Sequence, residues 1–196
     1  ANAFFETVSG YTTTGASILN DIESLDHGIL YWRSLTQWIG GMGIIVLAVA
    51  ILPFLGIGGM QLFVAEAPGV SVDKLQPRIK ETAQRLWQIY ISFTVALFFI
   101  LWAEGMDSFQ AINHAMTTFA TGGFSTKNAS IGYFESPLIQ YTIILFMFIS
   151  ATNFTLTYFA INLNFKKVIN NEEFRIYFFF IVILTLIVFL TLLGID

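Results

Sequence analysis

The chain has 196 residues, of which 56% are hydrophobic and only 11% are charged, and its formal net charge is −4. An ordinary soluble domain carries about 25% charged residues, so this composition excludes a typical water-exposed surface and predicts a lipid bilayer as the surroundings. The acidic balance excludes a basic footprint for nucleic acid, and the lack of cysteine excludes disulfides and thiolate metal sites.

The chain begins with a short, semi-polar segment over residues 3–12, which we expect to form a short helix. Its start has neither a charged region nor a cleavage site, so it is not a signal peptide, and we expect the chain to be a piece of a longer protein. The stretch that follows is rich in threonine and glycine and contains Thr13, Thr14 and Gly15.

Four apolar runs follow in chain order. A helix that crosses a bilayer needs about 20 mostly apolar residues, and the predicted spanning segments are 29–55, 86–102 with its flanks, 138–163 and 174–193. Between the second and the third lies the segment 108–121, which is too short and too polar to span. Asp107 or Ser108 suits the N-cap of a short helix there. Thr121, Gly122 and Gly123 stand at its end.

The two Thr/Gly stretches form an internal repeat with an offset of 108 residues. Thr13 corresponds to Thr121, Gly15 to Gly123, and Ser17 to Ser125. A fixed offset with the same order of elements is typical of a repeated unit, here an outer helix, a short pore helix, a filter strand and an inner helix.

The predicted fold is therefore an all-α membrane protein built from pore-loop units like those of K⁺ channels, with about two of four repeats present. We assign residues 1–55 to the pore loop and inner helix of repeat 1, 56–85 to a cytoplasmic linker, and 86–163 to repeat 2. Residues 164–196 are assigned to a second cytoplasmic linker and the outer helix of repeat 3.

The distribution of basic residues predicts the orientation in the membrane. The two linkers hold seven of the nine basic residues, namely Lys74, Arg78, Lys80, Arg85, Lys166, Lys167 and Arg175. Cytoplasmic loops carry an excess of Lys and Arg, so both linkers are expected inside and both filter stretches should open from the outside. The acidic residues of the opposite side would raise the local cation concentration, although solvated loops alone also explain them.

The filter strands are the candidate ion-binding residues. A cation that leaves water needs replacement oxygens, and successive backbone carbonyls supply them without net charge. Glycine allows the backbone dihedrals that such a strand requires, and the carbonyl end of the preceding short helix favours a cation. The alternative is that both stretches are ordinary turns between buried helices, but their recurrence in matched context favours the filter.

Other residues suggest structural roles. Gly40 and Gly43 can share one helix face and let another backbone approach closely. Asn153 and Thr155 fall inside the predicted helix 138–163, where polar groups bond to a neighbouring helix or line an inner cavity. Arg33 is expected to snorkel or to pair with an acid such as Asp26.

The two histidines lack a matching set of metal ligands. His27 is expected near the start of a helix at the interface, and His114 lies on the second pore helix, where Glu6 stands in the first copy. We therefore predict no metal role for either histidine.

Several motifs resemble the TrkH/TrkG-type potassium uptake subunits of bacteria, a branch of the Trk/Ktr/HKT superfamily. They extend along the chain in the family's order: Thr12–Ala16, Gln37–Leu47, Gly58–Leu62, Ala65–Gly69 and Gly122–Thr126. The Ala65-Glu66-Ala67-Pro68-Gly69 linker is similar to the TrkH/TrkG branch rather than to the Ktr or plant HKT branches.

The resemblance implies four repeats around one pathway, K⁺ uptake by symport with some room for Na⁺, no bound cofactor, and a multi-pass location in the bacterial inner membrane. It also implies a homodimer and a cytoplasmic nucleotide-binding partner of the TrkA kind. K⁺-binding filter roles carry over to Thr13, Thr14, Gly15, Thr121, Gly122 and Gly123. Gly122 departs from the wider superfamily, in which a side chain is common at that position.

Two other function classes were weighed. An intramembrane serine hydrolase at Ser9-Gly10 has no matched base or oxyanion pattern, so no enzymatic activity is expected. A membrane scaffold whose glycines only pack remains the alternative to an ion pathway.

Overall fold

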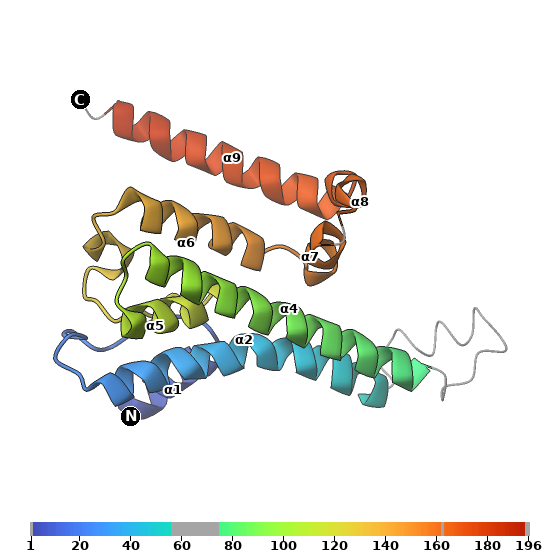
Figure 1. Cartoon of the computed structure of the whole chain (residues 1–196), viewed down its shortest axis with the longest axis horizontal. Coiled ribbons are helices and arrows are strands. Elements are labelled where there is room, and N and C mark those ends of the chain that lie inside the picture. The colour runs from blue at the N-terminus through green and yellow to red at the C-terminus, as the bar shows by residue number, and fades with distance from the viewer. Residues whose placement is uncertain (1, 56–74, 162, 195–196) are drawn as a thin grey trace. The chain divides into compact units, whose positions relative to one another are not determined.

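The computed structural model describes residues 2–55, 75–161 and 163–194. All regular elements in these ranges are helices (Figure 1): α1 (Asn2–Tyr11), α2 (His27–Leu55), α4 (Leu75–Ala103), α5 (Ser108–Phe119), the short 3-10 helix η2 (Ser130–Tyr133), α6 (Pro137–Ser150), α7 (Phe154–Ile161), α8 (Phe165–Ile169) and α9 (Glu172–Leu193). The chain divides into two compact units, residues 1–150 and 151–196, which are described separately.

In the first unit, α2 and α4 pack against each other, and α5 packs against α2, α4 and α6, while α1 lies against α2 (Figure 1). An aromatic cluster joins α4 to α5. The ring of Phe119 meets Tyr90 edge-on at a centroid distance of 5.2 Å and stacks on Phe93 at 5.5 Å. Such pairs add about 0.5–1.5 kcal/mol beyond the area they bury, and they fix the second short helix against its outer helix.

The C-terminal ends of both short helices pack against two consecutive glycines of α2, Gly40 and Gly41. A Cβ on Gly40 would collide with the backbone of Tyr11 at the end of α1, and one on Gly41 would crowd Ala120 at the end of α5. Small residues let helix backbones approach closely. The expected packing role is therefore correct for Gly40, but a Cβ on its predicted partner Gly43 meets no described atom within 4 Å, and Gly41 takes that place.

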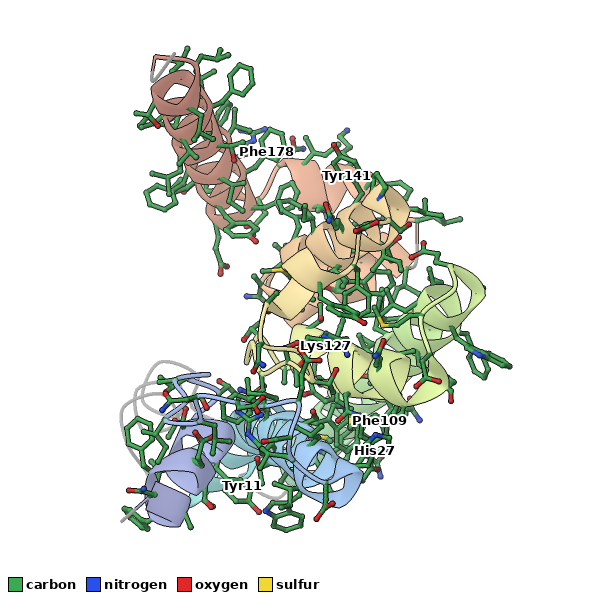
Figure 2. All side chains as sticks on the ribbon, turned by 90° about the vertical axis from the view of Figure 1, so that its left-hand side faces the viewer. Tyr11, His27, Phe109, Lys127, Tyr141 and Phe178 are labelled. Carbon is green, nitrogen blue, oxygen red and sulfur yellow. The ribbon has the colours of Figure 1, made fainter. Side chains whose placement is uncertain are left out.

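The predicted short helices are confirmed. α1 begins one residue before the expected segment 3–12, and α5 falls within the expected segment 108–121. α5 is capped by Asp107, whose carboxylate accepts a hydrogen bond from the Phe109 N–H at 2.9 Å. α2 begins at His27, as expected for a residue near a helix start, and the ring of His27 stacks on Phe109 at 4.1 Å (Figure 2).

Two helices differ from the apolar segments expected. α4 begins at Leu75, before the apolar run 86–102, so the last part of the segment assigned to the linker 56–85 is helical, and residues 56–74 lie outside the described ranges. The predicted single helix 138–163 breaks after Ser150, and α7 starts at Phe154. The Ser150 hydroxyl bonds back to the Met147 carbonyl at 3.0 Å, and short polar side chains of this kind compete with the helical ladder.

Asn153, expected inside that helix, instead lies in the break. Its carbonyl accepts the N–H groups of Leu156 and Thr157, which opens α7. Its side-chain amide donates to Glu173 at 3.3 Å within the second unit. The expectation for the Thr155 side chain falls outside what the structure describes.

In the second unit, α9 is apolar on all sides. Asn171 caps it by accepting from the Phe174 N–H at 2.9 Å, yet no residue of α9 is buried, and side chains such as Phe178 extend from its surface (Figure 2). Within the described residues, two stretches are long and apolar enough to cross a membrane, Gln84–Ala103 and Glu172–Leu193. A helix that is hydrophobic all round is suited to lipid or to a larger protein interior.

Candidate functional site

The two Thr/Gly loops have the same backbone conformation. Thr13 and Thr121 take φ values of 52° and 54°, and Gly15 and Gly123 take 75° and 83°. All four lie in the left-handed region, and each pair is separated by the offset of the predicted repeat. The repeat is therefore present in backbone geometry as well as in residue type.

Hydrogen bonds at the ends of α1 and α5 repeat as well. In each copy two N–H groups of the loop return to carbonyls of the preceding helix in the pattern of a Schellman motif. The bonds are Thr13 N–H to Gly10 (2.9 Å) and Thr14 N–H to Ser9 (3.0 Å) in the first copy, and Thr121 N–H to Thr118 (3.0 Å) and Gly122 N–H to Thr117 (2.9 Å) in the second.

The residue at the left-handed position after each helix is threonine rather than glycine. A β-branched residue with positive φ is an outlier that costs on the order of 1–3 kcal/mol. Such strain persists only where the surrounding structure imposes it, and it clusters at functional sites. The surrounding structure therefore imposes the positive φ of Thr13 and Thr121 in both loops.

A side-chain tether holds the first loop to its short helix. The Ser17 hydroxyl donates to the Glu6 carboxylate at 2.6 Å and accepts from the Leu19 N–H at 3.2 Å. The Ile18 N–H donates to the same carboxylate oxygen at 2.7 Å. Glu6 thus fixes the strand just beyond Gly15.

The second loop has the corresponding tether with different chemistry. His114 Nδ1 lies 2.8 Å from the Gln110 carbonyl, which only accepts, so in the neutral ring Nδ1 carries the proton and Nε2 is an acceptor. The Ser125 hydroxyl donates to Nε2 at 3.1 Å and accepts from the Lys127 N–H at 3.0 Å. The offset of 108 thus joins Glu6 to His114, Ser17 to Ser125 and Leu19 to Lys127.

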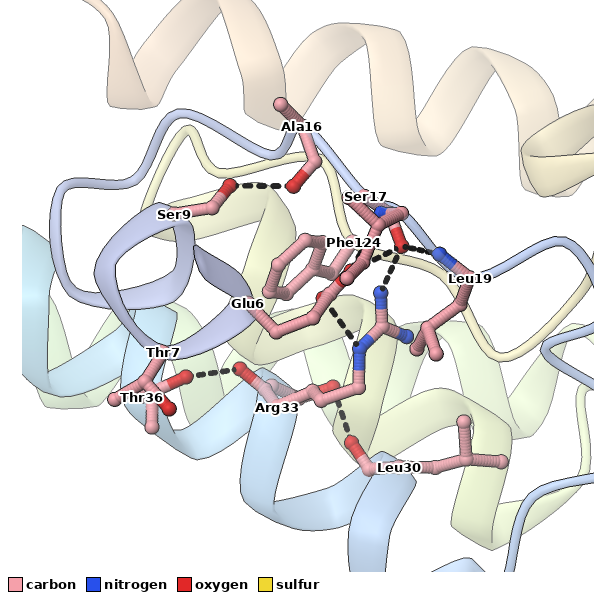
Figure 3. A network of polar contacts seen from close by, with 12 residues as sticks. Glu6, Thr7, Ser9, Ala16, Ser17, Leu19, Leu30, Arg33, Thr36 and Phe124 are labelled. Carbon is pink, nitrogen blue, oxygen red and sulfur yellow. Dashed lines mark hydrogen bonds and ion pairs between the residues drawn. The ribbon is translucent and has the colours of Figure 1, made fainter. Parts of the chain in front are cut away.

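Arg33 of α2 links the two loops (Figure 3). Its Nε lies 3.3 Å from Glu6 and its terminal nitrogen donates to Ser17 at 3.2 Å. The guanidinium carbon sits 4.1 Å from the ring centroid of Phe124 in the second loop. The acid that pairs with Arg33 is therefore Glu6 rather than the suggested Asp26, because the short helix brings Glu6 against this turn of α2.

Gln37, one helical turn further along α2, was not singled out by the sequence. It is fully buried, its amide nitrogen donates to the Gly122 carbonyl at 2.9 Å, and its amide oxygen accepts from the Phe124 N–H at 3.1 Å. The signal that could have found it is a polar residue inside an apolar helix, four positions after Arg33.

The structure brings part of the predicted filter together. A Cβ on Gly15 would collide with the Gly122 carbonyl, so the two strands touch at this point. Gly122 is buried, whereas Thr14, Thr121 and Gly123 are exposed. The hydroxyls of Thr12 and Thr14 are 2.8 Å apart.

Beyond the filter residues, the two outer loops are fastened to each other. Lys127 Nζ donates to Glu23 at 3.1 Å, and the Asn128 amide donates to Asp21 at 3.1 Å while its oxygen accepts from the Ile22 N–H at 2.7 Å. These bonds lower the pKa values of both carboxyls, through Asn128 at Asp21 and through Lys127 at Glu23, and the bond to Glu23 raises the pKa of Lys127. We call these four side chains, Asp21, Glu23, Lys127 and Asn128, the outer clasp.

These features define a class of helical protein with repeated pore loops, in which short helices end in glycine-containing strands held by a shared inner helix. The chain belongs to the TrkH family of cation transport proteins, whose family pattern matches residues 1–195.

Relatives of known name agree with this family. The Trk system potassium uptake protein TrkH of Escherichia coli K12 is 53% identical over 192 residues, and TrkG of the same organism is 44% identical over 189 residues; each match covers 95% of this chain. A crystal structure of the potassium transporter TrkH from Vibrio parahaemolyticus matches 98% of the chain with a TM-score of 0.82 and 46% identity. The chain spans about 40% of the length of these relatives.

Proposed function

We propose that this chain supplies two of the four filter loops of a membrane subunit for K⁺ uptake. The single observation that carries the proposal is the pair of loops with matched positive φ values and matched helix-end hydrogen bonds at an offset of 108 residues. Relatives named as potassium uptake proteins support K⁺ as the ion.

The filter is proposed to consist of Thr13, Thr14 and Gly15 in repeat 1 and Thr121, Gly122 and Gly123 in repeat 2, with backbone carbonyls as K⁺ ligands. Thr121 and Gly123 are exposed, so their carbonyls are free to face the proposed ion pathway. The Gly122 carbonyl already accepts a hydrogen bond from Gln37. A carbonyl oxygen has two lone pairs, so Gly122 retains one for a second partner.

The assignment of segments, membrane and partners follows from the family. Residues 1–55 and 86–163 are proposed as the two pore-loop repeats, joined by the cytoplasmic linker 56–85, in a multi-pass protein of the bacterial inner membrane. A homodimer and a TrkA-like nucleotide-binding subunit are the proposed assembly, since the relatives carry the name of a Trk system.

Ion-dependent stabilisation tests the proposal. A ligand that binds only the folded state stabilises it by about 2.7 kcal/mol at one hundred times its dissociation constant. The purified full-length protein should therefore melt at a higher temperature in K⁺ than in a matched concentration of a large organic cation such as N-methylglucamine. Equal melting temperatures would support a membrane scaffold instead of an ion pathway.

A further inference from the structure

Gln37 occupies the junction between the two filter loops. Its side-chain nitrogen lies 2.9 Å from the Gly122 carbonyl and its oxygen 3.1 Å from the Phe124 N–H, so one amide spans the backbone on both sides of Gly123. The same nitrogen would be 3.7 Å from a Cβ on Gly15 of the other loop. One buried side chain therefore meets both glycine positions of the repeat.

The fit between Gln37 and Gly122 is also steric. A Cβ on Gly122 would collide with the amide carbon and oxygen of Gln37, although Gly122 does not have a positive φ that requires glycine. Glycine at this position is therefore explained by the volume of the amide. The amide of Gln37 thus fills the space that a side chain at position 122 would occupy.

The bonds of Gln37 differ from those of its polar neighbours on α2. Ser34 and Thr36 are equally buried, but their hydroxyls bond to carbonyls of α2 itself, at Leu30 and Arg33. Gln37 instead gives both of its bonds to the backbone of the second loop, across 85 and 87 residues of sequence. Because the amide of Gln37 holds both the Gly122 carbonyl and the Phe124 N–H, it restricts the rotation of the peptide units on either side of Gly123.

We propose that Gln37, paired with Gly122, is a positioning residue that sets the direction of the carbonyls around Gly123 and thereby the ion preference of the second filter loop. The inference rests on the proposed K⁺ pathway. Gln37 does not touch the ion itself; it occupies one lone pair of the Gly122 carbonyl, and so fixes how this oxygen and that of Gly123 are directed.

The test compares three single variants of the full-length protein in liposomes, with K⁺ and Na⁺ fluxes measured separately. Gln37→Glu, assayed at alkaline pH so that the carboxyl is ionised, keeps the shape and the acceptor for Phe124 but cannot donate to Gly122. Gln37→Leu removes both bonds at similar volume. Ser34→Ala is the matched control, since it removes a buried hydroxyl of the same helix that bonds only within α2. Loss of a buried bond of this kind predicts a fall of about tenfold in the K⁺/Na⁺ flux ratio for both Gln37 variants, and an unchanged ratio for Ser34→Ala.

Compensation separates positioning from folding. Gly122→Ala alone should collide with Gln37 and lower the flux ratio, whereas Gly122→Ala combined with Gln37→Ser should recover part of the folded yield and flux without restoring the ratio. A coupling between the two positions in this cycle supports the pair.

The outcomes distinguish the two proposals. If the unchanged protein shows no K⁺-selective flux, the proposed function is wrong and the inference falls with it. A selective unchanged protein whose folded Gln37 variants keep their flux ratio within twofold overturns only the role of Gln37. Failure of both Gln37 variants to fold, with Ser34→Ala folded, assigns Gln37 to stability and likewise overturns the inference.

Discussion

The short helices α1 and α5 occupy corresponding places in the two repeats, yet their side chains have opposite surroundings. Val8 and Tyr11 of α1 are each 41% exposed, whereas their counterparts Met116 and Phe119 in α5 are 4% and 2% exposed. α5 is enclosed by α2, α4 and α6, while α1 packs on α2. Beside α1, a cavity of about 420 Å³ opens between this helix, the outer loop and α2, with Glu6 and Arg33 in its wall.

The loops that follow these helices nevertheless have nearly equal φ values at corresponding residues. Within the described residues, equal loop geometry accompanies what the two copies share: the helix-end hydrogen bonds, the glycine two residues after the threonine, and the serine tether. What differs between the copies gives four ways to test this comparison.

The largest effect is expected at the two glycines proposed for the filter. Both Gly15→Ala and Gly123→Ala place a Cβ on a residue with positive φ, which costs about 1–2 kcal/mol. At Gly15 the Cβ would also collide with the Gly122 carbonyl, whereas at Gly123 it meets no described atom within 4 Å. Gly15→Ala should reduce both folded yield and K⁺ flux at least about tenfold, and Gly123→Ala should mainly alter the K⁺/Na⁺ flux ratio. Equal losses of yield would contradict the crowded junction between the loops.

A somewhat smaller effect is expected where α2 receives the end of α1. Gly40→Ala forces a Cβ against the Tyr11 backbone, while the Cβ of Gly43→Ala meets no described atom within 4 Å. In a helix interior alanine is favoured over glycine by about 1 kcal/mol, so Gly43→Ala should leave the melting temperature unchanged or higher. Gly40→Ala should lower it, and thermal unfolding of the two variants in detergent makes the comparison. A higher melting temperature for Gly40→Ala would refute the close approach of α1.

The two tethers should respond unequally to loss of the same hydroxyl. Ser125→Ala leaves the Nε2 atom of the buried His114 without its donor, and an unsatisfied buried group costs about 1–3 kcal/mol. Ser17→Ala leaves Glu6 with two further donors, the Ile18 N–H and Arg33, so its cost should stay near 0.5–1.5 kcal/mol, in the range of about one hydrogen bond. Chemical or thermal unfolding measures the loss of stability in both variants. A larger loss for Ser17→Ala than for Ser125→Ala would contradict the greater dependence of the second loop on its serine.

The smallest effect is expected at the exposed outer clasp. The pKa of Glu23 is lowered from its usual 4.5, first by the bond from Lys127, so the clasp contributes stability above that value and loses it as the pH falls through the lower pKa of the folded state. The pKa of Lys127 is raised above 10.5, so its part is present below that value and lost in strong alkali. Exposed ion pairs contribute little and are screened by salt.

Melting curves between pH 7 and pH 3 should therefore show a small, salt-sensitive loss that is reduced in Glu23→Gln. The variant Asp26→Gln is a control in the same loop, outside the clasp. An identical pH profile for Glu23→Gln and the unchanged protein would show that the outer clasp does not contribute to stability.

Much of this arrangement could be predicted from residue pattern alone. The short helices, the repeat offset and the Asp107 cap follow from local signals: a polar segment before Thr and Gly, and an acid ahead of a helix. The family was also recognisable, because its motifs occur in order along the chain.

What could not be predicted depends on contacts between distant segments. The break after Ser150 coincides with polar residues, Ser150, Thr152 and Asn153, inside an otherwise apolar run. Average hydropathy over the run reports suitability for lipid and not whether the ladder of hydrogen bonds continues. Arg33 was assigned to a nearby acid in sequence, whereas its partner Glu6 lies 27 residues away. Gln37 gave only the weak signal of a polar group in an apolar helix, and its meaning appears once α2 and the second loop are packed together.

The position of Gln37 has a consequence for biosynthesis. A ribosome completes α2 well before residues 108–125 leave its exit tunnel, since chains are made from the N-terminus at about 5–20 residues per second. The surface that shapes the second loop, with the amide of Gln37 and the notch at Gly41, is thus available when α5 arrives. α2 of repeat 1 would then act as a template for the second loop. A defect in α2 should first appear in the nascent chain as a second loop that is inserted but still accessible to protease.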